Sequence, residues 1–193
     1  MIFDNTNLRA AAVTTMLMLL VTSTAAASQR CELDVRLTTP TSRFTINAGV
    51  VLDTQSQRKW MRCPLGWSLD SRETDNTLDD VCVAGDSAIY DITTAVNEVS
   101  ALNDAQGLTG DDAWRIANLE ELQSITERAC TQPAVNLSVF PARALSVTLA
   151  ANISGRGYPF SYDFNDGTSN AFFSGVADGD LNGPTGTIWL VRR

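Results

Sequence analysis

An acidic segment near the C-terminus has the residue pattern most typical of a metal site. Residues 178–183 read D-G-D-L-N-G, so Asp178, Asp180 and Asn182 place oxygen ligands on alternate residues, as at the start of a calcium-binding loop. An EF-hand needs Glu where this chain has Trp189, which excludes a complete EF-hand. Two interpretations remain. One is a non-EF Ca²⁺ loop completed by Asp163 or Asp166, and the other is a solvated acidic turn, the more common use of Asp, Asn and Gly.

Trp114 and Arg115 form a second candidate, an aromatic face beside a cation. Such a pair suits ligand binding. The alternative is that Trp114 lies in the core while Arg115 braces a loop or a carboxylate. Tryptophan is usually well buried, which favours the alternative.

Three glutamates, Glu120, Glu121 and Glu127, supply carboxylates of the kind that glycoside hydrolases use in pairs. Glu121 stands three residues after Asn118, which predicts a reciprocal helix cap. Glu120 is favourable in the first turn of the same helix. Because nothing marks an acid with a raised pKa, we expect a protein that is not an enzyme, with a carboxylate-based hydrolase as the remaining enzymatic possibility.

Aromatic residues gather between 158 and 173 in an alternating pattern that predicts one strand face for Tyr158, Phe160, Tyr162 and Phe164. Such a face forms either a contact surface for a sugar or protein, or part of the core. The core is the more common use of this stripe.

The composition excludes several classes of catalytic and metal site and disfavours one class of partner. The chain has 193 residues, a net charge of −8 and no histidine. The missing histidine excludes Ser-His-Asp and Cys-His catalytic systems and every His-ligated metal site. The acidic charge disfavours nucleic acid as a partner, because the phosphate backbone would be repelled.

The N-terminus resembles a secretory signal. Arg9 ends a polar start, Ala10 to Val21 is apolar, and the small residues that follow satisfy an A-x-A pattern at Ala25 and Ala27. We therefore expect a signal peptide over residues 1–27 and one domain over residues 28–193. An uncleaved anchor is less favoured because the apolar run is short. The expected location is the periplasm, the cell surface or the medium, with no transmembrane segment in the mature chain.

Four cysteines in an exported chain predict two disulfides, with three possible connectivities. Cys63 and Cys82 flank an acidic polar stretch, so we pair them as a loop staple. Cys31 would then join Cys130. A zinc site needs closely spaced cysteine pairs, which are absent here.

Hydrophobic spacing predicts helices over Ile92 to Ala105, capped by Asp91, and over Leu119 to Ala129. Short strands are expected before and after them. They include Ser146 to Leu149, Tyr158 to Asn165 and Ala171 to Phe173, with a terminal strand over Thr187 to Val191. Strands, then helices, then strands again indicate an α+β fold.

Four motifs occur together in order: W-M-R-C-P-L-G at 60–66, W-R-I-A-N-L-E-E-L at 114–122, P-A-V-N with V-F-P at 133–141, and I-W-L-V-R at 188–192. The set resembles the bacterial Lcl C-terminal domain family, named after the tail of a collagen-like adhesin. The resemblance covers residues 31–193. It implies an exported α+β domain with a C-type-lectin-like arrangement of short antiparallel strands and two helices.

The resemblance also implies a binding function, since the named member is implicated in adhesion through sulfated glycans. The chain departs from the family pattern at Ile116-Ala117, at Leu145 to Leu149 and at Trp189. The second departure removes aromatic side chains suited to sugar stacking, and the net charge of −8 opposes a polyanion. We therefore expect an exported, non-catalytic adhesion module for a carbohydrate, surface polymer or surface protein. The alternative is a structural or assembly component of the bacterial envelope or of a surface appendage.

Overall fold

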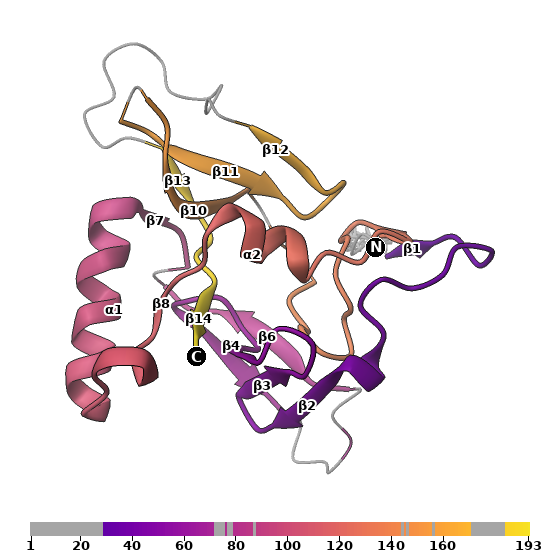
Figure 1. The fold of residues 1–193 in the computed structure, drawn as a ribbon, viewed down its shortest axis with the longest axis horizontal. Coiled ribbons are helices and arrows are strands. Elements are labelled where there is room, and N and C mark those ends of the chain that lie inside the picture. Colours follow the sequence, from indigo (N-terminus) through magenta and orange to yellow (C-terminus); the bar gives the residue numbers. More distant parts are fainter. Residues whose placement is uncertain are drawn as a thin grey trace, which may run out of the picture.

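The computed structural model describes residues 29–71, 76, 79–86, 88–143, 145, 147–155, 157–170 and 184–193. These residues form small antiparallel sheets with two α-helices and two disulfides (Figure 1), which confirms the α+β class. The helices are α1 (Ile92–Gln106) and α2 (Leu119–Ser124), with short 3₁₀ helices at Thr41–Arg43 and Gly110–Asp112. The strands are β1 (Arg30–Cys31), β2 (Phe44–Asn47), β3 (Val50–Asp53), β4 (Arg58–Met61), β5 (Trp67–Asp70), β6 (Val81–Ala84), β7 (Tyr90–Asp91), β8 (Arg115–Ile116), β9 (Cys130–Thr131), β10 (Val147–Ile153), β11 (Pro159–Asp163), β12 (Thr168–Asn170), β13 (Thr185–Gly186) and β14 (Leu190–Arg192).

A five-stranded sheet, in the order β2-β3-β4-β14-β8, is the largest sheet described. The C-terminal strand β14 lies between β4 and β8, so the chain end is part of the sheet (Figure 1). The expected terminal strand over Thr187 to Val191 is therefore shorter and begins later, at Leu190. The pairing sets Ile46, Val51, Trp60, Val191 and Arg115 opposite one another in one row across the sheet.

The main core lies on the face of this sheet that carries Val51, Trp60 and Val191, all fully buried. The ring of Phe140 makes edge-to-face contacts with Trp60 and Trp189, at centroid distances of 6.3 and 5.2 Å. Aromatic pairs prefer this geometry, and it adds to the free energy of burial. Trp189, which departs from the family pattern, is thus a central core residue.

Helix α1 begins at Asp91, whose side chain accepts hydrogen bonds from the backbone N–H groups of Thr93 and Thr94. It ends at Gly107, which adopts the left-handed conformation that helix ends favour. Both limits agree with the sequence to within one residue. The helix buries Ala95 and Val99 in a second core cluster, whereas Val96 is 54% exposed.

Helix α2 is shorter than expected, ending at Ser124 instead of Ala129. Beyond it, Thr126 pairs with Val135 as an isolated β-bridge, and the Glu127 carboxylate accepts backbone N–H groups from residues 38 and 39. These long-range bonds take the place of the helical hydrogen bonds, so the helix ends before this segment. Ile125 is nevertheless buried, as its apolar side chain led us to expect.

The two disulfides join Cys31 to Cys130 and Cys63 to Cys82, the pairs expected from the sequence. Cys31 and Cys130 face each other across the β1–β9 pair. The segment between Cys63 and Cys82, expected to be a polar loop, contributes paired strands β5 and β6.

Strands β10, β11 and β12 form a separate antiparallel sheet, drawn above α2 in Figure 1. Strand β10 begins near the expected position but extends to Ile153, and the turn at Asp166-Gly167 leads into β12. The strand expected at Ala171 to Phe173 lies outside the described residues, as does the signal peptide expected at residues 1–27. Among the described residues, no helix combines the length and apolar character needed to cross a membrane.

Candidate functional site

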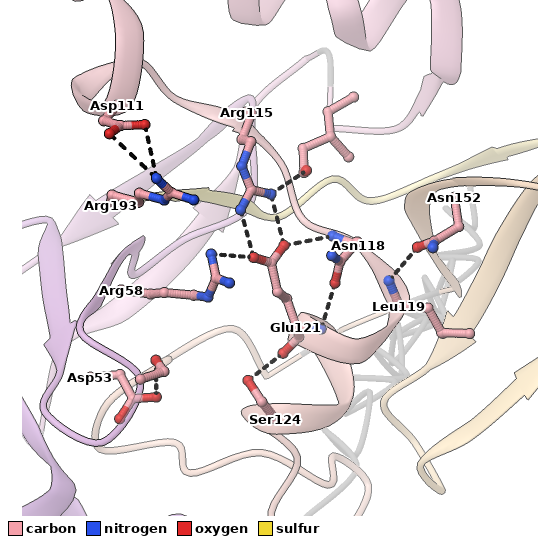
Figure 2. A network of polar contacts seen from close by, with 12 residues as sticks. Asp53, Arg58, Asp111, Arg115, Asn118, Leu119, Glu121, Ser124, Asn152 and Arg193 are labelled. Atoms are coloured by element: carbon pink, nitrogen blue, oxygen red, sulfur yellow. Dashed lines mark hydrogen bonds and ion pairs between the residues drawn. The ribbon is translucent and has the colours of Figure 1, made fainter.

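Glu121 is the centre of a polar network at the start of α2 (Figure 2). Asn118 caps the helix by accepting the N–H of Glu121 at 2.8 Å, and the Glu121 carboxylate accepts the N–H of Asn118 at 2.9 Å. This capping box confirms the reciprocal cap expected from the sequence.

Two guanidinium groups from separate strands also bind the Glu121 carboxylate. Arg115 of β8 binds both oxygens, at 2.8 and 2.6 Å, and Arg58 of β4 lies 2.7 Å from Oε1 (Figure 2). Burial acts to raise the pKa of Glu121, but the hydrogen bonds from Arg115 and Asn118 outweigh it, so the pKa is lowered. A carboxylate held ionised in this way cannot be a general acid near neutral pH, and its oxygens are already occupied. We therefore assign Glu121 a structural role.

Trp114 and Arg115 do not act as a pair. Trp114 is buried in the second core cluster, and its backbone is held by the side chain of Asn103. Arg115 binds Glu121 instead. The cation that lies over the Trp114 ring is Arg192, at 4.5 Å from the centroid. Sequence reasoning missed Arg192 because the two residues are brought together only by the insertion of β14.

A long polar groove runs past the C-terminal end of α2. It consists of three adjoining hollows of about 650, 440 and 340 Å³. The first two share Thr38, Arg43 and Gln55, and the last two share Gln123, Thr126 and Arg128. Because neighbouring hollows share lining residues, they adjoin, and we refer to the three together as the polar groove.

Glu127 holds one wall of the polar groove in place. Its carboxylate accepts the backbone N–H groups of Thr38 and Thr39, at 3.0 and 2.8 Å, and that of Ala129 at 3.0 Å. Burial acts to raise the pKa of Glu127, yet these N–H groups lower it overall. The buried anion thereby fastens the segment after β1 to the segment after α2, and its role is structural.

The polar groove is basic although the whole chain is acidic. Its guanidinium groups belong to Arg36, Arg43 and Arg128, against one carboxylate, Asp166. Arg43 is neutralised by the buried carboxylate of Asp53 at 2.5 Å. Arg36 and Arg128 are exposed and have no ion pair among the described residues. No sequence pattern marked these residues, because they come from three distant segments.

The aromatic stripe is divided by burial. Tyr162 and Phe164 are 2% and 0% exposed and belong to the main core, whereas Tyr158 is 46% exposed. The Tyr162 hydroxyl hydrogen-bonds Thr126 at 2.6 Å beneath the third hollow of the groove. Burial raises the pKa of Tyr162, so its hydroxyl stays protonated at neutral pH.

The expected metal ligands Asp178, Asp180 and Asn182 lie outside the described residues. Asp163 and Asp166, proposed to complete that site, each accept a backbone N–H two residues later, from Asn165 and Thr168. Within the described part of the chain, no group of three or more Cys, Asp or Glu is placed to hold a metal ion.

The described residues form a small, disulfide-linked α+β domain with an open groove past the C-terminal end of α2. The chain belongs to the Lcl C-terminal domain family, which matches residues 49–192 and so confirms the resemblance seen in the motifs. Neither a curated protein nor a solved structure matches the chain.

Proposed function

We propose that this protein is an exported, non-catalytic adhesion module that binds a carbohydrate or another surface polymer along the polar groove. The observation that carries the proposal is the succession of three adjoining hollows, which together offer an elongated surface instead of one enclosed pocket. A polymer chain can lie along such a surface, whereas a compact substrate would be better held in a closed cavity.

The lining chemistry supports a polyhydroxylated ligand. Side-chain amides come from Gln55 and Gln123, hydroxyls from Ser56 and Ser124, and a free guanidinium from Arg128. The amides and hydroxyls donate and accept hydrogen bonds and the guanidinium donates them, which suits sugar hydroxyls. Family membership is consistent with this use, and two disulfides favour an exported location. A C-type-lectin-like arrangement of the strands and helices is part of the proposal.

A glycan array tests the proposal directly. We expect the protein without residues 1–27 to bind a subset of neutral or anionic glycans, and binding to anionic glycans to weaken as salt rises because exposed arginines are screened. Arrays with Ca²⁺ and with chelator test whether Asp178, Asp180 and Asn182 bind calcium in support of the site. Failure to bind any glycan or surface polymer in either condition overturns the proposal.

Matched variants locate the binding surface. Arg128→Met removes an unpaired groove cation, and Gln123→Ala removes an exposed groove amide. Arg143→Met is the control, since Arg143 is also exposed but does not line the groove. Loss of binding in the first two variants with retention in the third supports the groove. Equal loss in all three contradicts it.

The alternative, a structural or assembly component of the envelope, is favoured by one exposed segment. Leu33, Val35 and Leu37 are 97%, 49% and 47% exposed and alternate along the segment after β1, which projects from the body in Figure 1. Alternating apolar side chains on a projecting segment suit contact with another protein. A stoichiometric partner that is recovered with the protein and lost in Leu33→Ser, while glycan binding is absent, would favour this alternative.

A further inference from the structure

A separate pocket of about 290 Å³ lies beside the end of α1, and it shares no lining residue with the polar groove. Val50 and Met61 are opposed across β3 and β4, and alternation places them on the sheet face away from Trp60. Two polar side chains, Gln106 and Arg192, line the pocket. The other lining residues are mainly apolar or aromatic: Gly49, Val50, Met61, Cys63, Trp67, Leu69 and Trp114.

Among the described residues, Arg192 is the only charged side chain that lines this pocket. Its guanidinium stacks on the Trp114 ring, and Nη1 donates to the Asp112 carbonyl at 2.8 Å. Within the described part of the chain, its Nε is buried without a hydrogen-bond partner, and no carboxylate forms an ion pair with Arg192. Because protein encloses Nε, the donors that Arg192 can offer to a ligand in the pocket are the N–H groups of its two Nη atoms.

The position of this cation is fixed before any ligand arrives. Stacking on Trp114 and the bond to Asp112 hold the guanidinium plane, so little side-chain freedom is lost on binding. The pocket volume lies at the lower limit for small-molecule sites, which hold roughly 300–1,000 Å³. A single ring or branched aliphatic group fits, whereas an oligosaccharide does not.

We propose that this pocket binds a small organic anion, a single apolar ring or branched aliphatic group that carries a carboxylate. The apolar walls take the hydrocarbon part, and Arg192 takes the carboxylate as a charge-assisted hydrogen-bond acceptor. The ligand is either a free carboxylic acid or the C-terminal residue of a polypeptide. The proposal is independent of the groove.

Calorimetric titration of the disulfide-bonded protein with 3-phenylpropanoate tests the proposal. We expect it to bind at least about tenfold more tightly than 3-phenylpropanol, which lacks the charge, or propanoate, which lacks the ring. Equal affinity of the acid and the alcohol, or no binding of the acid at millimolar concentration, overturns it.

A peptide arm distinguishes the two sources of the carboxylate. The tripeptide Gly-Gly-Phe, with a free C-terminus, is compared with its C-terminal amide and with 3-phenylpropanoate. Tighter binding of the peptide acid identifies a polypeptide C-terminus, and tighter binding of 3-phenylpropanoate identifies a free acid. If the peptide amide binds as well as both acids, the proposal is wrong.

Charge variants at the pocket complete the test. Arg192→Met keeps an apolar stem and should weaken 3-phenylpropanoate at least about tenfold. Arg192 is partly buried, so its replacement could also disturb folding. Gln106 is exposed and lines the same pocket, so two substitutions there test the charge without that risk. Gln106→Glu should weaken the binding of 3-phenylpropanoate, and Gln106→Lys should strengthen it. Unchanged affinity in both Gln106 variants contradicts the proposal. Arg128→Met should leave the binding of 3-phenylpropanoate unchanged, and Arg192→Met should leave glycan binding unchanged. A negative result for one proposal therefore does not decide the other.

Discussion

At the scale of single residues, Glu121 illustrates how a carboxylate can look catalytic in sequence and be structural in the fold. It completes the capping box that Asn118 begins at the start of α2, and it also joins α2 to β4 and β8 through Arg58 and Arg115. The cap alone is worth about 1 kcal/mol. The two arginines add charge-assisted bonds around a carboxylate that is only 5% exposed, so the residue contributes more than a cap.

We predict that Glu121→Ala lowers the free energy of unfolding by about 1–2 kcal/mol, because the capping-box bond and the arginine bonds are lost while the half-exposed arginines stay solvated. Urea denaturation at pH 7 measures the change. Glu120→Ala is the control, since Glu120 is exposed in the same turn, and it should cost less than about 0.5 kcal/mol. A loss at Glu121 no larger than that of the control would show that the network contributes little.

The lowered pKa values of Glu121 and Glu127 predict acid sensitivity. The ordinary pKa of each is 4.5, and the folded pKa lies below it. Their stabilisation is therefore fully present above pH 4.5 and is lost as the pH falls through the folded values, because the unfolded chain takes up protons first. Glu127→Gln should lower stability at pH 7 and flatten this acid limb. Unfolding curves between pH 7 and pH 2 measure it, and a slope equal to that of the unsubstituted protein contradicts the assignment.

At the scale of elements, close backbone approach determines where β13 can lie. A Cβ on Gly186 would lie 2.5 Å from the Val147 carbonyl oxygen and 3.2 Å from the Leu149 side chain. The same carbonyl accepts the N–H of Thr187 at 2.9 Å. Gly186 is therefore needed for the contact that joins β10 to the chain leading into β14.

Gly186→Ala should destabilise the protein by about 1–3 kcal/mol, the usual effect of forcing atoms into a packed site. Thermal unfolding measures the change. Gly155→Ala is the matched control, because a Cβ there would meet nothing within 4 Å. If the two substitutions have the same effect, the approach of β13 to β10 is looser than the structure shows.

At the scale of the whole molecule, the disulfides differ in how much chain they close. Cys31 and Cys130 are separated by 99 residues, and Cys63 and Cys82 by 19. The longer loop encloses α1, α2 and four strands of the five-stranded sheet. Loop-closure entropy in the unfolded chain increases with this separation.

Replacing Cys31 and Cys130 with serine should lower the free energy of unfolding by about 4–5 kcal/mol, against about 3 kcal/mol for Cys63 and Cys82. Denaturant unfolding of the two double variants measures the difference. A larger loss for the Cys63–Cys82 pair would contradict the entropic ranking and point to packing around that disulfide, which lies in the main core.

The net charge of the whole chain and the local charge of the polar groove have opposite signs. The net charge of −8 suggests that a polyanion would be repelled. The polar groove nevertheless presents Arg36 and Arg128 without carboxylate partners in the described part of the chain. Over distances longer than about 8–10 Å, salt screens the rest of the surface, so an anion at the groove would meet mainly the local positive charge.

Local signals in the sequence determined several features. The Asp91 and Asn118 caps, the end of α1 at Gly107 and the family motifs depend on residues close together in the chain, and each was identified correctly. The disulfide pairs also agreed with expectation. The caps and the end of α1 are predictable because residues close in the chain supply their hydrogen bonds and backbone preferences.

Only the tertiary structure decided the length of α2, the stacking of Arg192 on Trp114 and the existence of the polar groove. Glu127 ends the helical region by binding the backbone at Thr38 and Thr39, and β14 brings the C-terminus beside β4 and β8. These contacts join residues about 75 to 130 positions apart. No periodicity or spacing in the sequence encodes them, because they depend on which surfaces the chain buries together.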